Sequence, residues 1–132
     1  MAVVRVPIVA GILCGVFLVG CGSDGSDLAA EACVPTGARS VGFDPNTAPL
    51  SELERNARVA AQRASLAAQA AATDRRWQAL SDAANALSAF ADVLRDARMD
   101  DVPIADVTTP AMWDQAKYAS DAFLIECRRV TS

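Results

Sequence analysis

The ten residues "AATDRRWQAL", at positions 71–80, interrupt the longest helical pattern of the chain. Between residues 51 and 98 the sequence has neither glycine nor proline, so one helix of about 70 Å, at ~1.5 Å per residue, is conceivable. Within the quoted stretch, however, Thr73 and Asp74 each have a side chain that favours the N-cap position of a helix. Either residue would start a new helix just before Trp77. The stretch therefore predicts a break and two antiparallel helices.

A second pattern in the same region favours one continuous helix. A strict seven-residue spacing, which is typical of a coiled-coil seam, is formed by Val59, Leu66, Thr73, Leu80, Leu87 and Leu94. An unbroken helix of this length would leave its first half without enough partner surface. We therefore favour a small antiparallel three-helix bundle, which buries Leu53, Val59 and Leu66 within one chain. One long helix packed against a shorter one is the alternative.

The residues that flank the helical patterns predict where each helix begins and ends. Ser51 and Glu54 have the spacing of a capping box, which predicts a helix start at residue 51. The sequence "DDVP" at residues 100–103 ends the next helix. Thr109 and Pro110 have the order of an N-cap and a first helical residue. We therefore predict an all-α fold with helices at about 51–72, 75–98 and 110–130.

Large apolar side chains are few in this sequence. Alanine supplies much of the 52% hydrophobic content, and the main large residues of the candidate core are Leu53, Leu66, Trp77, Leu80, Leu87, Phe90, Leu94, Trp113, Phe123 and Leu124. In the last helix Phe123 and Cys127 share one apolar stripe, which directs this cysteine toward the core. Each tryptophan is expected to cover one end of the core. An exposed aromatic contact for a partner or a glycan is the alternative.

The start of the chain, "MAVVRVPIVAGILCGVFLVGCGS", has the three-part order of a secretory signal. Arg5 is the only charged residue before position 24, and the apolar run after it is shorter than the roughly 20 residues of a membrane-spanning helix. At the end of this run Leu18, Val19, Gly20 and Cys21 resemble the lipobox of bacterial lipoproteins. An ordinary signal peptide or an uncleaved anchor is the alternative.

The lipobox resemblance implies that Cys21 receives a diacylglyceryl group on its sulfur and that cleavage removes residues 1–20. Several acyl chains on one residue anchor a protein stably, whereas a single chain binds a membrane reversibly. Residues 21–32 begin with "CGSDGSD" and are expected to form a flexible lipidated tether, followed by a helical domain at 33–132. The expected location is the cell membrane, with the domain on the extracytoplasmic side.

Cysteine usage predicts one disulfide. Cys14 lies in the predicted signal and Cys21 is assigned to the lipid, so that Cys33 and Cys127 remain of the four cysteines. An exported protein enters an oxidising compartment, where these two are expected to pair within one chain. Two free thiols or a disulfide between chains are the alternatives. Residues 33–48, "CVPTGARSVGFDPNTA", contain two prolines and two glycines and predict an irregular strap before the first helix.

The charge of the chain is acidic. It has 12 basic and 16 acidic residues, and removal of Arg5 with the signal leaves 11 and 16, or a net charge of −5. The sequence has no basic stripe with interleaved aromatic residues, so nucleic acid is not an expected partner. An anionic membrane surface should repel such a domain. The expected partners are the membrane, through the lipid on Cys21, and an unidentified envelope protein or ligand.

Motifs for catalysis are missing from the sequence. It contains no histidine, no glycine-rich phosphate loop and no Gly-x-Ser-x-Gly motif. Asp92 with Asp96, and Asp100 with Asp101, are carboxylate pairs, but their spacing predicts no catalytic cleft. We therefore expect no enzyme activity, no cofactor and no metal site. The predicted function is a non-enzymatic binding or structural module of the cell envelope. A carrier of a lipid or other apolar ligand is the first alternative, and a small hydrolase is the second.

Overall fold

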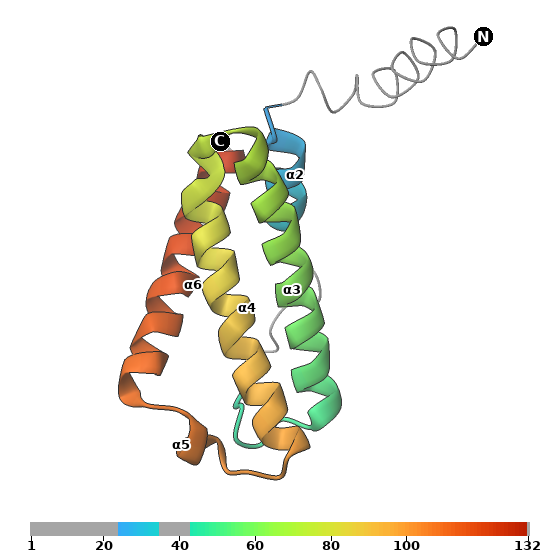
Figure 1. Cartoon of the computed structure of the whole chain (residues 1–132), viewed down its shortest axis with the longest axis vertical. Coiled ribbons are helices and arrows are strands. Elements are labelled where there is room, and N and C mark those ends of the chain that lie inside the picture. The colour runs from blue at the N-terminus through green and yellow to red at the C-terminus, as the bar shows by residue number, and fades with distance from the viewer. Residues whose placement is uncertain (1–23, 35–42, 132) are drawn as a thin grey trace, which may run out of the picture.

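The computed structural model describes residues 24–34 and 43–131, and these two ranges contain helices and turns but no strand (Figure 1). The elements are, in chain order, α2 (Ser26–Ala32), α3 (Leu50–Thr73), the 3-10 helix η1 (Arg75–Trp77), α4 (Gln78–Met99), α5 (Ile104–Val107) and α6 (Pro110–Thr131). The predicted all-α fold is confirmed. No helix in the described ranges is both long enough and apolar enough to cross a membrane. The predicted signal, Cys21 and residues 35–42 of the predicted strap lie outside the described residues.

The predicted break lies between α3 and α4. α3 ends at Thr73, and the next residue, Asp74, has an extended backbone with φ −147°. The Asp74 carboxylate accepts a hydrogen bond from the Arg76 amide at 2.9 Å, and this cap starts η1 and then α4. α4 runs back along α3, so Leu53 and Leu94 meet in one buried cluster. The three-helix bundle is confirmed, and the alternative of one long helix is wrong.

The predicted helix starts have different outcomes. The Thr109 hydroxyl accepts a hydrogen bond at 3.2 Å from an amide in the first turn of α6, which begins at the predicted residue. The capping box at the start of α3 is wrong. α3 begins at Leu50, and its N-cap residue is Pro49, which provides no side-chain hydrogen bond. The extended Pro49 directs the chain into the helix one residue early, and Ser51 therefore lies exposed inside the first turn.

The prediction of a flexible tether at residues 21–32 is wrong for residues 26–32, which form α2. Gly25 precedes this helix with φ 85°, a backbone conformation that favours glycine. Ala29 and Ala32 are fully buried, and α2 packs against α3 and α6. A helix of seven residues is marginal by itself in water, so these tertiary contacts are what stabilise it.

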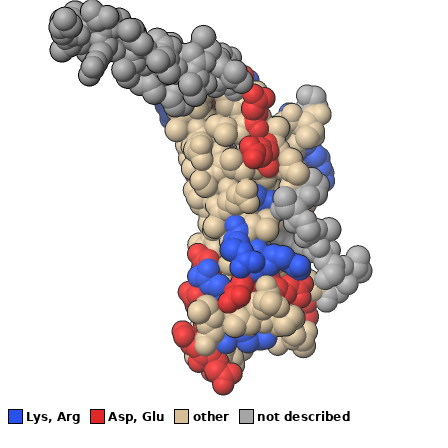
Figure 2. Space-filling view, turned by 90° about the vertical axis from the view of Figure 1, so that its right-hand side faces the viewer, with Lys and Arg blue, Asp and Glu red and all other residues tan. Residues whose placement is uncertain are grey.

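The surface carries both signs of charge. On the α3 side of the molecule, acidic and basic side chains are interspersed over the half that is remote from α2 (Figure 2). One local group joins Arg95 to Asp92 at 3.1 Å and to Asp96 at 2.9 Å. The hydrogen bond to Asp96 is the main cause that raises the pKa of Arg95. Exposed ion pairs of this kind add little to stability, because water screens them.

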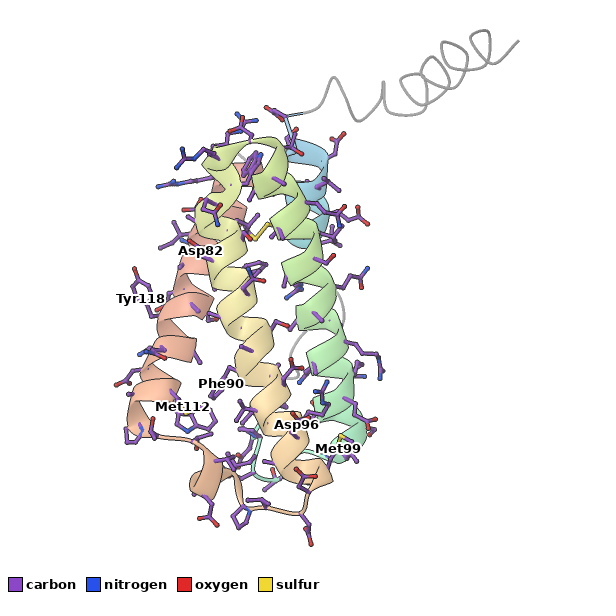
Figure 3. All side chains as sticks on the ribbon, in the orientation of Figure 1. Asp82, Phe90, Asp96, Met99, Met112 and Tyr118 are labelled. Carbon is purple, nitrogen blue, oxygen red and sulfur yellow. A yellow bond between two sulfur atoms is a disulfide. The ribbon has the colours of Figure 1, made fainter. Side chains whose placement is uncertain are left out.

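The predicted intramolecular disulfide between Cys33 and Cys127 is confirmed, with the two Cα atoms 5.5 Å apart. It joins the end of α2 to α6 in the half of the bundle where α3 turns into α4 (Figure 3). Both cysteines are partly buried against the larger cluster of the core. The bridge connects residues 94 positions apart and so closes most of the described domain into one loop.

The core consists of two clusters along the bundle. The larger cluster is rich in alanine and contains Trp77, Leu80 and Phe123, near the disulfide. The smaller cluster, at the other end, contains Leu53 and Leu94 together with Ile104 of α5. Leu124, which we predicted in the core, is 52% exposed, so that prediction is wrong. α6 packs mainly against α4 and α2 and contacts α3 through Phe123, whereas Leu124 lies on its exposed side.

Candidate functional site

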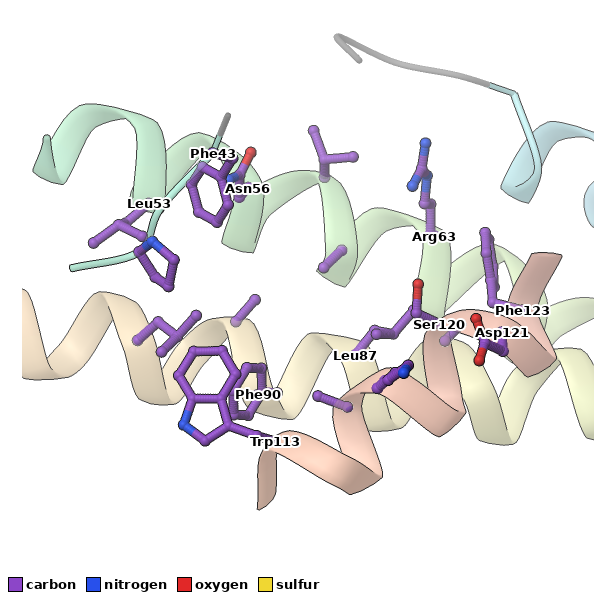
Figure 4. A pocket seen from close by; sticks show the side chains of 18 residues that line it. Phe43, Leu53, Asn56, Arg63, Leu87, Phe90, Trp113, Ser120, Asp121 and Phe123 are labelled. Carbon is purple, nitrogen blue, oxygen red and sulfur yellow. The ribbon is translucent and has the colours of Figure 1, made fainter. Parts of the chain in front are cut away.

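A cleft with a volume of about 490 Å³ lies between α3, α4 and α6 (Figure 4). α4 packs against both of its neighbours, whereas α3 and α6 make little contact with each other. At one end of the bundle α2 packs against both α3 and α6. α2 is only seven residues long, and no other helix of the described ranges separates α3 from α6 beyond it.

The end of the cleft nearest to α5 is apolar. Phe43, which precedes α3, Leu53 of α3 and Phe90 of α4 line it (Figure 4). Trp113 of α6 meets Phe90 edge to face, with ring centroids 4.8 Å apart and an angle of 77° between the planes. The indole N–H of Trp113 donates a hydrogen bond to the Thr108 hydroxyl at 3.2 Å, which positions the ring at the edge of the cleft.

The opposite end of the cleft, toward the disulfide, has most of the polar groups. The polar side chains of the lining are Asn56, which lies beside Phe43 at the other end, and Arg63, Lys117, Ser120 and Asp121 (Figure 4). The Arg63 guanidinium donates a hydrogen bond to the Val34 carbonyl at 3.1 Å, and its carbon lies 5.6 Å from the centroid of the Phe123 ring. Within the described residues, no carboxylate lies within ion-pair distance of the Lys117 ammonium group.

Aliphatic side chains line the middle of the cleft. Val59 and Ala60 of α3 face it from one side, Leu87 and Ala91 of α4 form its floor, and Ala116 of α6 completes the other side. All five are only partly buried. Val59 and Leu87 belong to the seven-residue spacing of the sequence, so part of the predicted seam is apolar surface that no further helix of residues 24–34 and 43–131 covers.

Arg98, in the last turn of α4, holds the turn that brings Phe43 and Pro45 to the cleft. Its guanidinium donates hydrogen bonds to the carbonyl oxygens of Pro45 and Asn46, each at 3.0 Å, and to that of Ala48. Three backbone acceptors from one turn are thus bound to a single side chain of the bundle. The apolar end of the cleft is therefore attached to the helices rather than left to a loose loop.

The residues predicted to carry function lie in different places. Cys33 and Cys127 form the structural disulfide, and Cys21 lies outside the described residues. Trp77 is buried in the core, as predicted. Trp113 is 37% exposed and lines the cleft, so its place matches the alternative interpretation of an accessible aromatic side chain.

Several cleft residues were not predicted as site residues, namely Phe43, Arg63 and Lys117. The available signal was weak: Lys117 follows Trp113 by one helical turn, so a charge adjoins the apolar stripe of the predicted third helix. No comparable signal marked Phe43, because it lies in the predicted irregular strap. In the described part of the chain, no three carboxylate or cysteine side chains lie close enough together to hold a metal ion.

Comparisons of the chain with protein-family models, with curated proteins and with solved structures find no match. The geometry and chemistry of the cleft are therefore the basis for a functional proposal.

Proposed function

We propose that this protein is a non-enzymatic binding module, held on the extracytoplasmic side of the cell membrane by a lipid on Cys21, with the cleft between α3, α4 and α6 as its binding site. The observation that carries the proposal is accessible apolar surface on three helices of a disulfide-bonded bundle. The cleft volume of about 490 Å³ lies within the ~300–1,000 Å³ range of small-molecule sites. A mostly apolar lining with a few polar groups is also typical of such sites.

A binding role fits the polar groups of the cleft better than nucleophilic catalysis. Nucleophilic catalysis by a serine needs a base within hydrogen-bonding distance of its hydroxyl. In the described part of the chain, Ser120 makes no hydrogen bond to Lys117 or Asp121. These side chains instead offer charge and hydrogen bonds along one edge of an apolar surface, which suits recognition of a ligand.

The proposed anchor would hold the α2 end of the bundle near the bilayer. Cys21 precedes Asp24, the first described residue, by three positions, and three residues span at most about 11 Å. Asp100, Asp101 and Asp106 lie at the other end of the bundle, and an anionic membrane would repel them. The apolar end of the cleft would then point away from the membrane. A fluorescent label at residue 75 should be quenched by headgroup quenchers more strongly than one at residue 106, and the reverse order would contradict this orientation.

The binding role is tested by looking for a ligand on the native protein. We expect native mass spectrometry of protein extracted from membranes in mild detergent to detect a small molecule that unfolding releases. Ala116→Glu places a charge inside the cleft and should remove the ligand, whereas Ala111→Glu, on the exposed outer side of α6, should retain it. Circular dichroism checks that both variants fold. Equal retention by two folded variants would contradict the cleft as the binding site.

A further inference from the structure

The charged side chains that line the cleft have a positive net charge, whereas the net charge of the whole protein is negative. Arg63 and Lys117 line the cleft with one carboxylate, Asp121, so the local sum of formal charges is +1. The entire chain has a formal net charge of −4. A locally positive site in an acidic protein favours a negatively charged group on the ligand, because opposite charges attract and a cationic group would meet two like charges.

We propose that the cleft binds a single-chain anionic amphiphile, whose alkyl chain lies along the apolar walls and whose one anionic head group lies beside Lys117. This inference rests on the proposed function, since it adds the chemical class of the ligand to the proposed binding site. It assigns the apolar body to the α5 end of the cleft and the head group to the polar end.

The shape and lining of the cleft indicate that the ligand has a single alkyl chain. Leu53 and Arg63 mark its apolar and polar ends on α3 and are ten residues apart, which corresponds to about 15 Å along the helix. Partly buried aliphatic side chains line the walls between these ends, with Leu87 on the floor. An elongated apolar ligand buries more of this surface than a compact one. The volume of about 490 Å³ favours one chain over the two of a membrane diacyl lipid, because it lies in the lower part of the ~300–1,000 Å³ range.

The position of Lys117 is the main argument for an anionic head group on the ligand. Lys117 is the only lysine of the chain and is exposed at the edge of the cleft. Asp121 follows it by one turn, but the two charged groups do not come within ion-pair distance. A flexible aliphatic stem lets a lysine ammonium reach a ligand while its methylene groups cover apolar surface. The Arg63 guanidinium adds a second positive charge to the lining.

The test compares three ligands with the same alkyl chain: dodecanoate, dodecanol and dodecylammonium, each below its aggregation concentration. The protein is the full chain from residue 21, with Cys21→Ser for solubility and the disulfide formed. We expect dodecanoate to bind about five- to tenfold more tightly than dodecanol, and dodecylammonium to bind most weakly. Lys117→Gln should reduce the dodecanoate affinity to that of dodecanol. Arg128→Gln, an exposed residue of α6 outside the cleft, should leave it unchanged.

Tryptophan fluorescence tests whether the ligand binds in the cleft, and the relative affinities test the chemical class of the ligand. Binding should change tryptophan fluorescence through Trp113, and Trp113→Phe should abolish that change, because Trp77 does not line the cleft. Equal affinities for the three ligands would overturn the anionic class while the cleft remained a binding site. Selective displacement of dodecanoate by phosphatidylglycerol vesicles, compared with phosphatidylcholine vesicles, would overturn the single-chain assignment in favour of a bilayer lipid. Failure of all three ligands, with a co-purified molecule still lost in Ala116→Glu, would overturn the amphiphile but not the proposed function.

Discussion

The indole N–H of Trp77 donates a hydrogen bond to the carbonyl oxygen of Asp24 at 2.9 Å, and this bond joins two residues 53 positions apart. The neighbouring Arg76 pairs with the Asp24 carboxylate. Gly25 follows in a left-handed conformation and is buried against Ala70 of α3. The described N-terminal segment is thus fixed to the turn between α3 and α4, and this contact positions α2 beside α3 and α6.

Gly25→Ala should destabilise the protein strongly. A Cβ atom at this position would lie 2.9 Å from the Ala70 carbonyl oxygen, and the φ of 85° is strained for any residue with a side chain. We expect a loss of about 1–3 kcal/mol in the free energy of unfolding, measured by urea denaturation. Ala30→Ser, at an exposed position of α2, should change it by less than ~0.5 kcal/mol. Equal stability of the two variants would show that the Gly25 contact does not exist in solution.

The disulfide should contribute a large part of the stability of the domain. The double substitution Cys33→Ala and Cys127→Ala opens a loop between residues 94 positions apart. We expect a loss of about 2–4 kcal/mol, because the unfolded chain then gains conformational freedom. Urea denaturation with and without a reducing agent measures this loss in the unsubstituted protein. The reducing agent should not change the unfolding free energy of the double variant. The prediction fails if the agent also leaves that of the unsubstituted protein unchanged.

The sequence was most informative where structure depends on neighbouring residues. The Asp74 cap and the Thr109 hydroxyl act within one or two turns, so their patterns predicted the α3–α4 break and the start of α6. α2 was missed because its seven residues depend on contacts with α3 and α6, which no local pattern contains. The disulfide was predictable because the assignments of Cys14 and Cys21 left one possible pair.

The cleft was not predictable, because an apolar helical stripe does not reveal which neighbour covers it. Val59 and Leu87 carry the same seven-residue pattern as the fully buried Leu80, yet they are only partly buried and line the cleft. The difference arises from the length of α2, which fills the space between α3 and α6 at one end only. Alanine adds to the ambiguity, since it occurs both in the close-packed cluster and along the cleft walls.

Arg98→Ala should loosen the apolar end of the cleft. The substitution removes the side chain that donates hydrogen bonds to the carbonyl oxygens of Pro45, Asn46 and Ala48. We expect a loss of about 1–3 kcal/mol in unfolding free energy, since hydrogen bonds to charged groups are among the stronger ones. Hydrogen exchange at residues 46–48 should also accelerate. Arg58→Ala, at an exposed position of α3, is the matched control and should leave both measurements unchanged.

Cys21→Ala should block lipid attachment. The lipobox resemblance implies that the Cys21 thiol accepts the diacylglyceryl group. Removal of this thiol should therefore also prevent cleavage before residue 21. Mass spectrometry of the protein from whole cells measures both events. Cys14→Ala changes the one cysteine of the predicted signal, residues 1–20, and should leave acylation and cleavage normal. A Cys21→Ala protein that is processed normally and retained in the membrane would exclude the lipoprotein assignment.

The same enlargement of an alanine should have opposite effects inside the cleft and inside the core. Ala67 of α3 is fully buried in the alanine-rich cluster, so Ala67→Leu overpacks that interface and should cost about 1–3 kcal/mol. Ala60, two turns earlier on the same helix, lines the cleft, where additional methyl groups find space. Ala60→Leu should therefore leave the free energy of unfolding unchanged or raise it by up to about 1 kcal/mol, and should weaken dodecanoate binding because it occupies the ligand volume. Urea denaturation and calorimetric titration measure the two effects. If Ala60→Leu destabilises the protein as much as Ala67→Leu, then α3 and α6 close against each other in solution and the cleft is part of the core.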